Sequence, residues 1–306
     1  MAIRFDDRVV IVTGAGNGLG RSHALEFARR GARIVVNDLG AARDGSGASS
    51  DAANAVVQRI IDEGGEAIAN GANVADCAQV EAMVGEAVDR WGRVDVLVNN
   101  AGILRDKTFA KMDLGDFQLV LDVHLGGSVN CAKAVWEQMR QQHYGRIVMT
   151  SSSSGIYGNF GQTNYGAAKM ALVGFMNSLA LEGGKYGIKV NALAPIAATR
   201  MTEDLMTREV LSLLEPEAVT PAVIFLASED APSRQILAAG AGVFARVVIQ
   251  ETPGVFLPRD HRDAEHVAAA WEQIGNATGG HELQAGGEQT MKFLQRAAAE
   301  LGIKLN

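Results

Sequence analysis

Short apolar runs alternate with amphipathic stretches along the first 250 residues. The runs are too short for helices and carry many β-branched residues, and the first of them, Val9 to Val12, is continuously apolar, which predicts strands buried in a parallel sheet. They cover residues 9–12, 34–36, 67–72, 94–98, 145–149 and 188–192. Between them, apolar residues recur at helical spacing, for instance over 52–63, 80–91, 113–139 and 165–185. The pattern therefore predicts an α/β fold of the doubly wound, Rossmann type, with helices on both faces of the sheet.

The pattern changes after residue 250. The stretch 252–260, TPGVFLPRD, is rich in proline and predicts a linker, and two helices are expected over 264–275 and 287–301. We therefore divide the chain into a domain of residues 1–250 and a helical extension of residues 251–306. An extension this short cannot bury a sufficient core by itself. We expect it to pack on the main domain or on a neighbouring subunit.

The composition of the chain limits which kinds of molecule it is expected to bind and where it is expected to be located. The net charge of −7 lacks the overall basic character of a nucleic-acid-binding chain. Cys77 and Cys131 have no metal-ligand spacing and indicate a reducing compartment, so neither a metal site nor a disulfide framework is expected. No apolar run is long enough to span a membrane. The chain starts without a signal pattern and ends in GIKLN rather than an S-K-L type address, so a cytoplasmic location is expected.

A glycine-rich turn, TGAGNGLG, follows the first predicted strand at residues 13–20. Glycines there permit a tight turn and let the backbone approach a pyrophosphate at the start of the next helix. The second strand leads into Asp38, about 20 residues further on, where an acid accepts hydrogen bonds from the adenosine ribose and repels a 2′-phosphate. These features predict NAD rather than NADP as the cofactor. The predicted loop contacts are Gly14, Gly16, Asn17, Gly18, Leu19 and Gly20.

A second stretch, residues 150–169, carries candidate catalytic groups. Tyr165 and Lys169 lie one helical turn apart in YGAAK, and Ser152 precedes them at the end of a predicted strand. A phenol has a pKa near 10, and a neighbouring ammonium lowers that pKa by favouring the phenolate. With a hydroxyl donor, the pair suits proton exchange at an alcohol or carbonyl oxygen. Taken alone, the same spacing also fits an ordinary amphipathic helix.

Three ordered motifs resemble those of the short-chain dehydrogenase/reductase family: TGAGNGLG at 13–20, NNAG at 99–102 and YGAAK at 165–169. The resemblance covers about residues 5–250. It implies oxidation of a secondary alcohol with NAD, catalysed by Ser152, Tyr165 and Lys169, in a homodimer or homotetramer. It also implies cofactor contacts from Asn73, Val74, Asn99, Ala101, Gly102, Tyr165, Lys169, Pro195 and Thr199.

His124 departs from the family pattern. The family's catalytic asparagine usually occupies this place, in a pattern like NLxG, whereas this chain has His-Leu-Gly-Gly at 124–127. A histidine can hydrogen-bond a water in a proton relay toward Lys169, and it adds a group that titrates near neutrality. The alternative is a structural histidine between helices.

A narrower resemblance concerns VVNDLG, VNNAGILRD, residues 143–165 and ATRMT. These segments are similar to the (3R)-hydroxyacyl-CoA dehydrogenase domains of peroxisomal multifunctional enzymes of type 2, also called 17β-hydroxysteroid dehydrogenases of type 4. The resemblance implies NAD-dependent oxidation of a (3R)-3-hydroxyacyl-CoA to a 3-ketoacyl-CoA in β-oxidation. A steroid alcohol is the alternative substrate, and a non-catalytic NAD-sensing protein is the alternative from another class. Residues 199–215 are expected to form a lid over the substrate.

Overall fold

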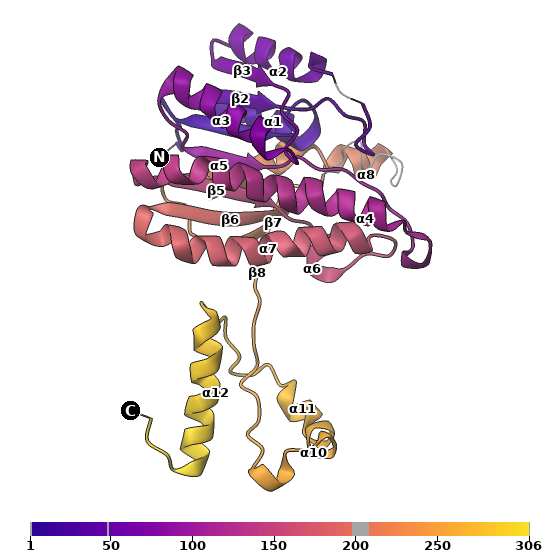
Figure 1. The fold of residues 1–306 in the computed structure, drawn as a ribbon, viewed down its shortest axis with the longest axis vertical. Coiled ribbons are helices and arrows are strands. Elements are labelled where there is room, and N and C mark those ends of the chain that lie inside the picture. The colour runs from indigo at the N-terminus through magenta and orange to yellow at the C-terminus, as the bar shows by residue number, and fades with distance from the viewer. Residues whose placement is uncertain (1, 48, 198–207, 306) are drawn as a thin grey trace. The chain divides into compact units, whose positions relative to one another are not determined.

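The structure is a computed structural model that describes residues 2–47, 49–197 and 208–305. The chain divides into two compact units, Met1–Arg246 and Val247–Asn306, coloured from indigo to yellow along the chain in Figure 1. Thr199 and most of the expected lid lie outside the described residues; of the lid, the structure describes the helix α8, Arg208–Leu213.

The first unit is built on an eight-stranded sheet in the order β3-β2-β1-β4-β5-β6-β7-β8. Every pairing from β3 to β7 is parallel. The strand order reverses between β1 and β4, and in such sheets ligands bind outside the carboxyl ends of the strands at this point. The strands are β1 Val9–Thr13, β2 Arg33–Asn37, β3 Glu66–Asn70, β4 Val96–Asn99, β5 Gly145–Thr150, β6 Ile188–Pro195, β7 Ile236–Gly240 and β8 Val243–Val247.

The last two strands form a hairpin. Ala241 and Gly242 connect them, and both have positive φ, 49° and 74°. Two such residues make the tight turn that joins antiparallel strands. The otherwise parallel sheet therefore ends in an antiparallel edge strand.

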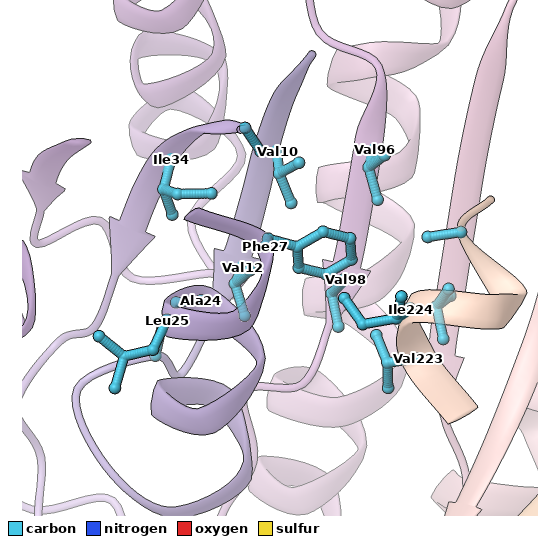
Figure 2. Close-up of a cluster of buried hydrophobic side chains, with 14 of the residues drawn as sticks. Val10, Val12, Ala24, Leu25, Phe27, Ile34, Val96, Val98, Val223 and Ile224 are labelled. Atoms are coloured by element: carbon cyan, nitrogen blue, oxygen red, sulfur yellow. The ribbon is translucent and has the colours of Figure 1, made fainter. Parts of the chain in front are cut away.

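Helices cover both faces of the sheet. The face that carries Val10, Val12, Val96 and Val98 packs against helix α1, Gly18–Arg29, and helix α9, Thr220–Leu226, in one core cluster. Figure 2 shows the ring of Phe27 from α1 next to Val98, with Val223 and Ile224 of α9 beside it. Burial on both faces explains the continuous apolar run at the start of β1.

Further helices of the first unit are α2 Asp51–Asp62, α3 Cys77–Trp91, α4 Leu114–Leu121, α5 Gly127–Gln142, α6 Ser153–Tyr157 and α7 Thr163–Gly183. Helix α5 contacts β4 and β5, and α7 contacts β5 and β6. Figure 1 shows α4, α5 and α7 crossing one face of the sheet. The single helix expected over 113–139 is interrupted by a π-helical turn, Asp122–Gly126, which contains His124. Such turns occur frequently at functional sites.

The second unit contains helices α10 Ala264–Ala269, α11 Trp271–Ile274 and α12 Gly286–Leu301. The helix expected over 264–275 is thus two short helices that join at Ala270. Among the described residues of this unit, Ala298 is the one buried hydrophobic residue. Hydrogen bonds join the parts of this unit instead. Glu251 accepts from Lys292 Nζ at 2.7 Å and from Gln289 Nε2 at 2.5 Å.

None of the helices in the described part of the chain has the length and apolarity that a membrane crossing requires.

Candidate active site

One cavity of about 530 Å³ lies at the carboxyl ends of the strands, where the strand order reverses. It is lined by all four predicted catalytic residues, His124, Ser152, Tyr165 and Lys169. Most predicted cofactor contacts also line it: Gly14, Asn17, Gly18, Leu19, Asp38, Asn73, Val74, Ala101, Gly102 and Pro195. The lining does not include three of the predicted contacts, which are Gly16, Gly20 and Asn99. Each of them is next in the chain to a residue that does line the cavity.

The glycine loop forms a backbone cradle at one end of this cavity. Gly14 and Gly18 have φ of 63° and 52°, a region that side chains disfavour. A Cβ on Gly20 would lie 2.2 Å from the carbonyl oxygen of Gly14, and one on Gly14 would lie 2.8 Å from Ala101 Cα. Helix α1 starts at Gly18, and no side chain caps its first turn. Unpaired backbone N–H groups beside such a cradle fit a dinucleotide pyrophosphate.

Asp38 anchors the glycine loop as well as lining the cavity. Its Oδ2 accepts a hydrogen bond from Gly16 N at 2.7 Å, and its Oδ1 accepts one from Gly40 N at 2.7 Å. A carboxylate oxygen can accept more than one hydrogen bond, so both oxygens keep capacity for a ribose hydroxyl. The same negative charge would oppose a 2′-phosphate.

Asn73 and Val74 follow β3 and line the cavity. The Asn73 Oδ1 accepts from Ala75 N at 3.0 Å, which shapes its own turn. Val74 is held from the other side, since its carbonyl accepts from Asn130 Nδ2 at 3.0 Å. One lone pair of the Asn73 side-chain oxygen is thus used by the protein, and its Nδ2 hydrogens point to no hydrogen-bond acceptor among the described residues.

Two residues that the sequence analysis did not single out hold the loop to β4. Asn100 Nδ2 donates to the carbonyls of Thr13 at 2.9 Å and Gly14 at 3.0 Å. Thr13 Oγ1 accepts in return from the backbone N–H groups of Asn100 and Ala101, both at 3.0 Å. Thr13 is the first residue of the TGAGNGLG motif and Asn100 is the second residue of NNAG. Both motifs therefore already contained the residues that hold the loop. Asn99 itself is buried and points its Nδ2 at Met149 Sδ, which braces β4 against β5.

Ser152 follows the end of β5 and is the N-cap residue of helix α6. Its Oγ accepts from Ser154 N at 3.1 Å. With a lone pair used there, the hydroxyl hydrogen is free to point elsewhere, and the Ser152 side chain acts on Tyr165 to lower the pKa of its phenol. The neighbouring Ser151 donates to the carbonyl of Lys169 at 2.9 Å, so the strand end is tied to helix α7.

Lys169 is buried beside Tyr165. Its Nζ donates to the carbonyl of Thr150 at 2.6 Å and lies 5.5 Å from the centroid of the Tyr165 ring. Burial lowers the pKa of Lys169 from 10.5 to about 7. Desolvation raises the pKa of Tyr165 above its ordinary value, and the hydrogen bond from Ser152 offsets this only in part.

The lowering of the Tyr165 pKa that was expected from Lys169 is not present in the protein by itself, because the same burial that brings the two groups together disfavours both charged forms.

His124 is buried in the π-helical turn, and its ring points at Ile103 in the loop that follows β4. Its Nε2 lies 2.9 Å from the carbonyl oxygen of Ile103 and 3.2 Å from Ile103 N. Its Nδ1 finds no hydrogen-bond partner among the described residues. Burial, followed by the nearby charge of Lys169, holds the pKa of His124 well below 6.5. The expectation of a group titrating near neutrality is wrong, because a neutral imidazole occupies this site.

The described part of the chain holds no group of three or more His, Cys, Asp or Glu side chains arranged to hold a metal ion.

Comparison with known proteins gives a family and several relatives. The profile of the short chain dehydrogenase family matches residues 8–210. A Mycobacterium tuberculosis protein whose name places it among short-chain type dehydrogenases/reductases is 49% identical, over 89% of this chain and 96% of its own length. The mouse peroxisomal multifunctional enzyme type 2 is 44% identical over 99% of this chain, which spans 42% of that enzyme.

Solved structures agree with these relatives. The full-length peroxisomal multifunctional enzyme type 2 of Drosophila melanogaster matches with a TM-score of 0.80 and 36% identity, covering 96% of this chain and 50% of its own. A 7α-hydroxysteroid dehydrogenase complexed with NADH and 7-oxo glycochenodeoxycholic acid matches with a TM-score of 0.71 and 30% identity, covering 78% and 95%. The chain thus resembles one half or less of each multifunctional enzyme.

Proposed function

This chain belongs to the short chain dehydrogenase family, and on that premise we propose that it oxidises a (3R)-3-hydroxyacyl-CoA to the 3-ketoacyl-CoA with NAD. It is an oxidoreductase with the fold and family of the peroxisomal hydratase-dehydrogenase-epimerase enzymes. The observation that carries the proposal is the meeting of Ser152, Tyr165, Lys169 and Asp38 in one cavity.

The cavity fits a nicotinamide dinucleotide. The cradle around Gly14 and the N-terminus of α1 suit the pyrophosphate, and Asp38 suits an unphosphorylated ribose. Lys169 would hydrogen-bond the nicotinamide ribose, and Ala101, Gly102 and Pro195 would contact the nucleoside faces. NAD⁺, when bound, supplies the hydride acceptor and a positive charge beside the phenol.

The protein's residues handle the substrate proton. Ser152 donates its hydroxyl hydrogen to the substrate oxygen, because Ser154 N already occupies one of its lone pairs. Tyr165 takes the hydroxyl proton at its phenolic oxygen as general base. Lys169, in its protonated form, stabilises the phenolate. His124 offers its unpartnered Nδ1 to a water that carries the proton away from Lys169.

The substrate class rests on the resemblance to the dehydrogenase domains of type 2 multifunctional enzymes. A steroid alcohol is the second candidate, because a related hydroxysteroid dehydrogenase matches with 30% identity and holds a steroid in its complex. A protein that only senses NAD is the third, and the assembled Ser152, Tyr165 and Lys169 weigh against it.

Assays of NADH formation distinguish these candidates. Both enantiomers of a 3-hydroxyacyl-CoA, estradiol and testosterone are each supplied with NAD and with NADP. We expect turnover of the (3R)-thioester with NAD. Turnover of the steroids alone would favour the second candidate, and NADH binding without turnover of any alcohol would favour the sensor. A preference for NADP would contradict the role given to Asp38.

Assembly and location extend the proposal. We propose a homodimer or homotetramer, with the Val247–Asn306 extension packed on the main domain or a neighbouring subunit; its near lack of buried apolar residues supports such packing. Light scattering during size-exclusion chromatography measures the subunit number. We propose a cytoplasmic location, although several relatives are named as peroxisomal, and cell fractionation separates the two.

A further inference from the structure

Four polar side chains line the cavity beside the catalytic residues. Asp106, Ser154, Asn159 and Gln162 form what we call the polar cluster. The amide of Gln162 joins them: its Nε2 donates to Asp106 Oδ2 at 2.7 Å, while its Oε1 accepts from Ser154 Oγ at 2.8 Å and Asn159 Nδ2 at 3.0 Å. These bonds set the orientation of the Gln162 amide, since its oxygen faces two donors and its nitrogen faces the carboxylate.

The polar cluster is continuous with the catalytic machinery. Ser154, which donates its hydroxyl to Gln162, also donates its backbone N–H to Ser152 Oγ at 3.1 Å. The negative charge of Asp106 reaches Tyr165 and raises the pKa of its phenol. No lysine, arginine or histidine in the described ranges forms an ion pair with Asp106. A carboxylate thus lines the same cavity as Tyr165 and has no ion-pair partner among the described residues.

Other parts of the lining are apolar. Leu119 and Val123 come from α4 and the π-helical turn, one helical turn apart, and both line the cavity. A 3-hydroxyacyl substrate has two unlike ends on either side of its reacting carbon. The alkyl chain matches the apolar residues, and the carbonyl end, two bonds from the reacting carbon, matches the amide N–H groups of Asn159 and Gln162 in the polar cluster.

From this arrangement, and resting on the proposed function, we propose that the polar cluster binds the C1 end of the substrate and that Asp106 selects neutral thioesters over free 3-hydroxy acids. Asp106 is exposed at the edge of the cavity, and a free acid would bring a second carboxylate next to it, so that two like charges repel at short range. A thioester has the same carbonyl without the charge. Asp106 is thus a specificity-determining residue for the acyl head group.

The test compares substrates that differ in that charge. The kcat/KM values are measured for (3R)-3-hydroxybutanoyl-CoA, its N-acetylcysteamine thioester and (3R)-3-hydroxybutanoate, in the wild type and in Asp106→Asn. Asparagine keeps an oxygen that accepts from Gln162, so only the charge is removed. We expect Asp106→Asn to raise the ratio of kcat/KM for the free acid to that for either thioester about fivefold, the size expected when a repulsion between exposed charges is removed.

A matched control is present on α2. Asp62 Oδ1 accepts from Gln58 Nε2 at 2.8 Å, much as Asp106 accepts from Gln162, but it lies outside the cavity lining. Asp62→Asn removes the same net charge and is expected to leave both ratios unchanged. Melting temperatures of both variants report their folding.

An unchanged ratio of acid to thioester in folded Asp106→Asn, with thioesters still turned over, overturns this inference alone. A rise of the ratio in Asp62→Asn as large as in Asp106→Asn overturns it too, because net charge would then be the cause. Absence of turnover with both thioesters in the wild type overturns the proposed function and this inference with it.

Discussion

The imidazole of His124 meets the phenol ring of Tyr165 edge to face, with ring centroids 5.2 Å apart and an interplanar angle of 87°. Gly102 permits this contact, since a Cβ there would lie 2.2 Å from Cε1 of His124. The neutral histidine thus packs directly against the proposed general base. Any change at one of these two rings alters the surroundings of the other.

Tyr165→Phe is expected to abolish turnover, since it removes the oxygen that takes the substrate proton. A general base contributes roughly 10²–10⁴-fold to rate, so kcat should fall by at least that factor. The ring remains, and fluorescence titration should therefore give an NADH affinity close to that of the wild type. Substantial residual kcat would refute the role of Tyr165.

His124→Ala is expected to lower kcat on the order of tenfold while leaving NAD affinity intact, because the proton relay loses its Nδ1 acceptor. Steady-state kinetics and a binding titration measure the two quantities. His23 is a matched control, as it is equally buried but lies outside the cavity lining. Unchanged turnover in His124→Ala would leave this residue a structural role only.

Asp38→Asn is expected to shift preference toward NADP. The variant keeps an oxygen for Gly16 N but removes the charge that opposes a 2′-phosphate. Repulsion between like charges in a binding site costs several kcal/mol, so the ratio of kcat/KM for NADP to that for NAD should rise on the order of 10- to 100-fold. An unchanged ratio would place cofactor selection elsewhere.

His23 is expected to make the protein sensitive to acid. Its Nδ1 lies 2.8 Å from Thr220 Oγ1 between α1 and α9, and burial lowers its pKa from 6.5 to about 3. Below pH 6.5 the unfolded state binds the proton that the folded state refuses, so stability falls as pH drops from 6.5 toward 3.

At pH 5.0 this single group should cost about 2 kcal/mol of unfolding free energy relative to pH 7.5. Guanidinium titrations at the two pH values measure the difference. His23→Gln should reduce that difference by the same amount, and an identical pH dependence in the variant would contradict the assignment.

A chain shortened to residues 1–246 is expected to fold, since its core cluster runs from Phe5 to Ala239 and uses no residue of the extension. It should unfold in one cooperative transition and retain NADH binding, because the glycine loop and Asp38 are unaffected. Thermal unfolding and NADH titration check both points. A shortened chain without a cooperative transition would mean that the extension is part of the folding unit.

Local sequence was sufficient for the strands, the glycine turn and the Tyr165–Lys169 pair. A strand buried on both faces is mostly apolar, and residues at i and i+4 of a helix share a face. Glycine at positive φ is likewise a local requirement, as at Gly14 and Gly18. These features need only the neighbouring residues, so they are visible without a fold.

The tertiary structure decided the protonation and partners of the same residues. Desolvation raises the Tyr165 pKa and keeps His124 neutral, and burial depends on elements distant in sequence. Two hydrogen bonds form where separate strands end side by side. Asn100 donates to the carbonyl of Thr13, and Asp38 accepts from the backbone N–H of Gly16. A sequence states which groups are available, whereas their pKa values and hydrogen bonds follow from the distances and the water exclusion that folding creates.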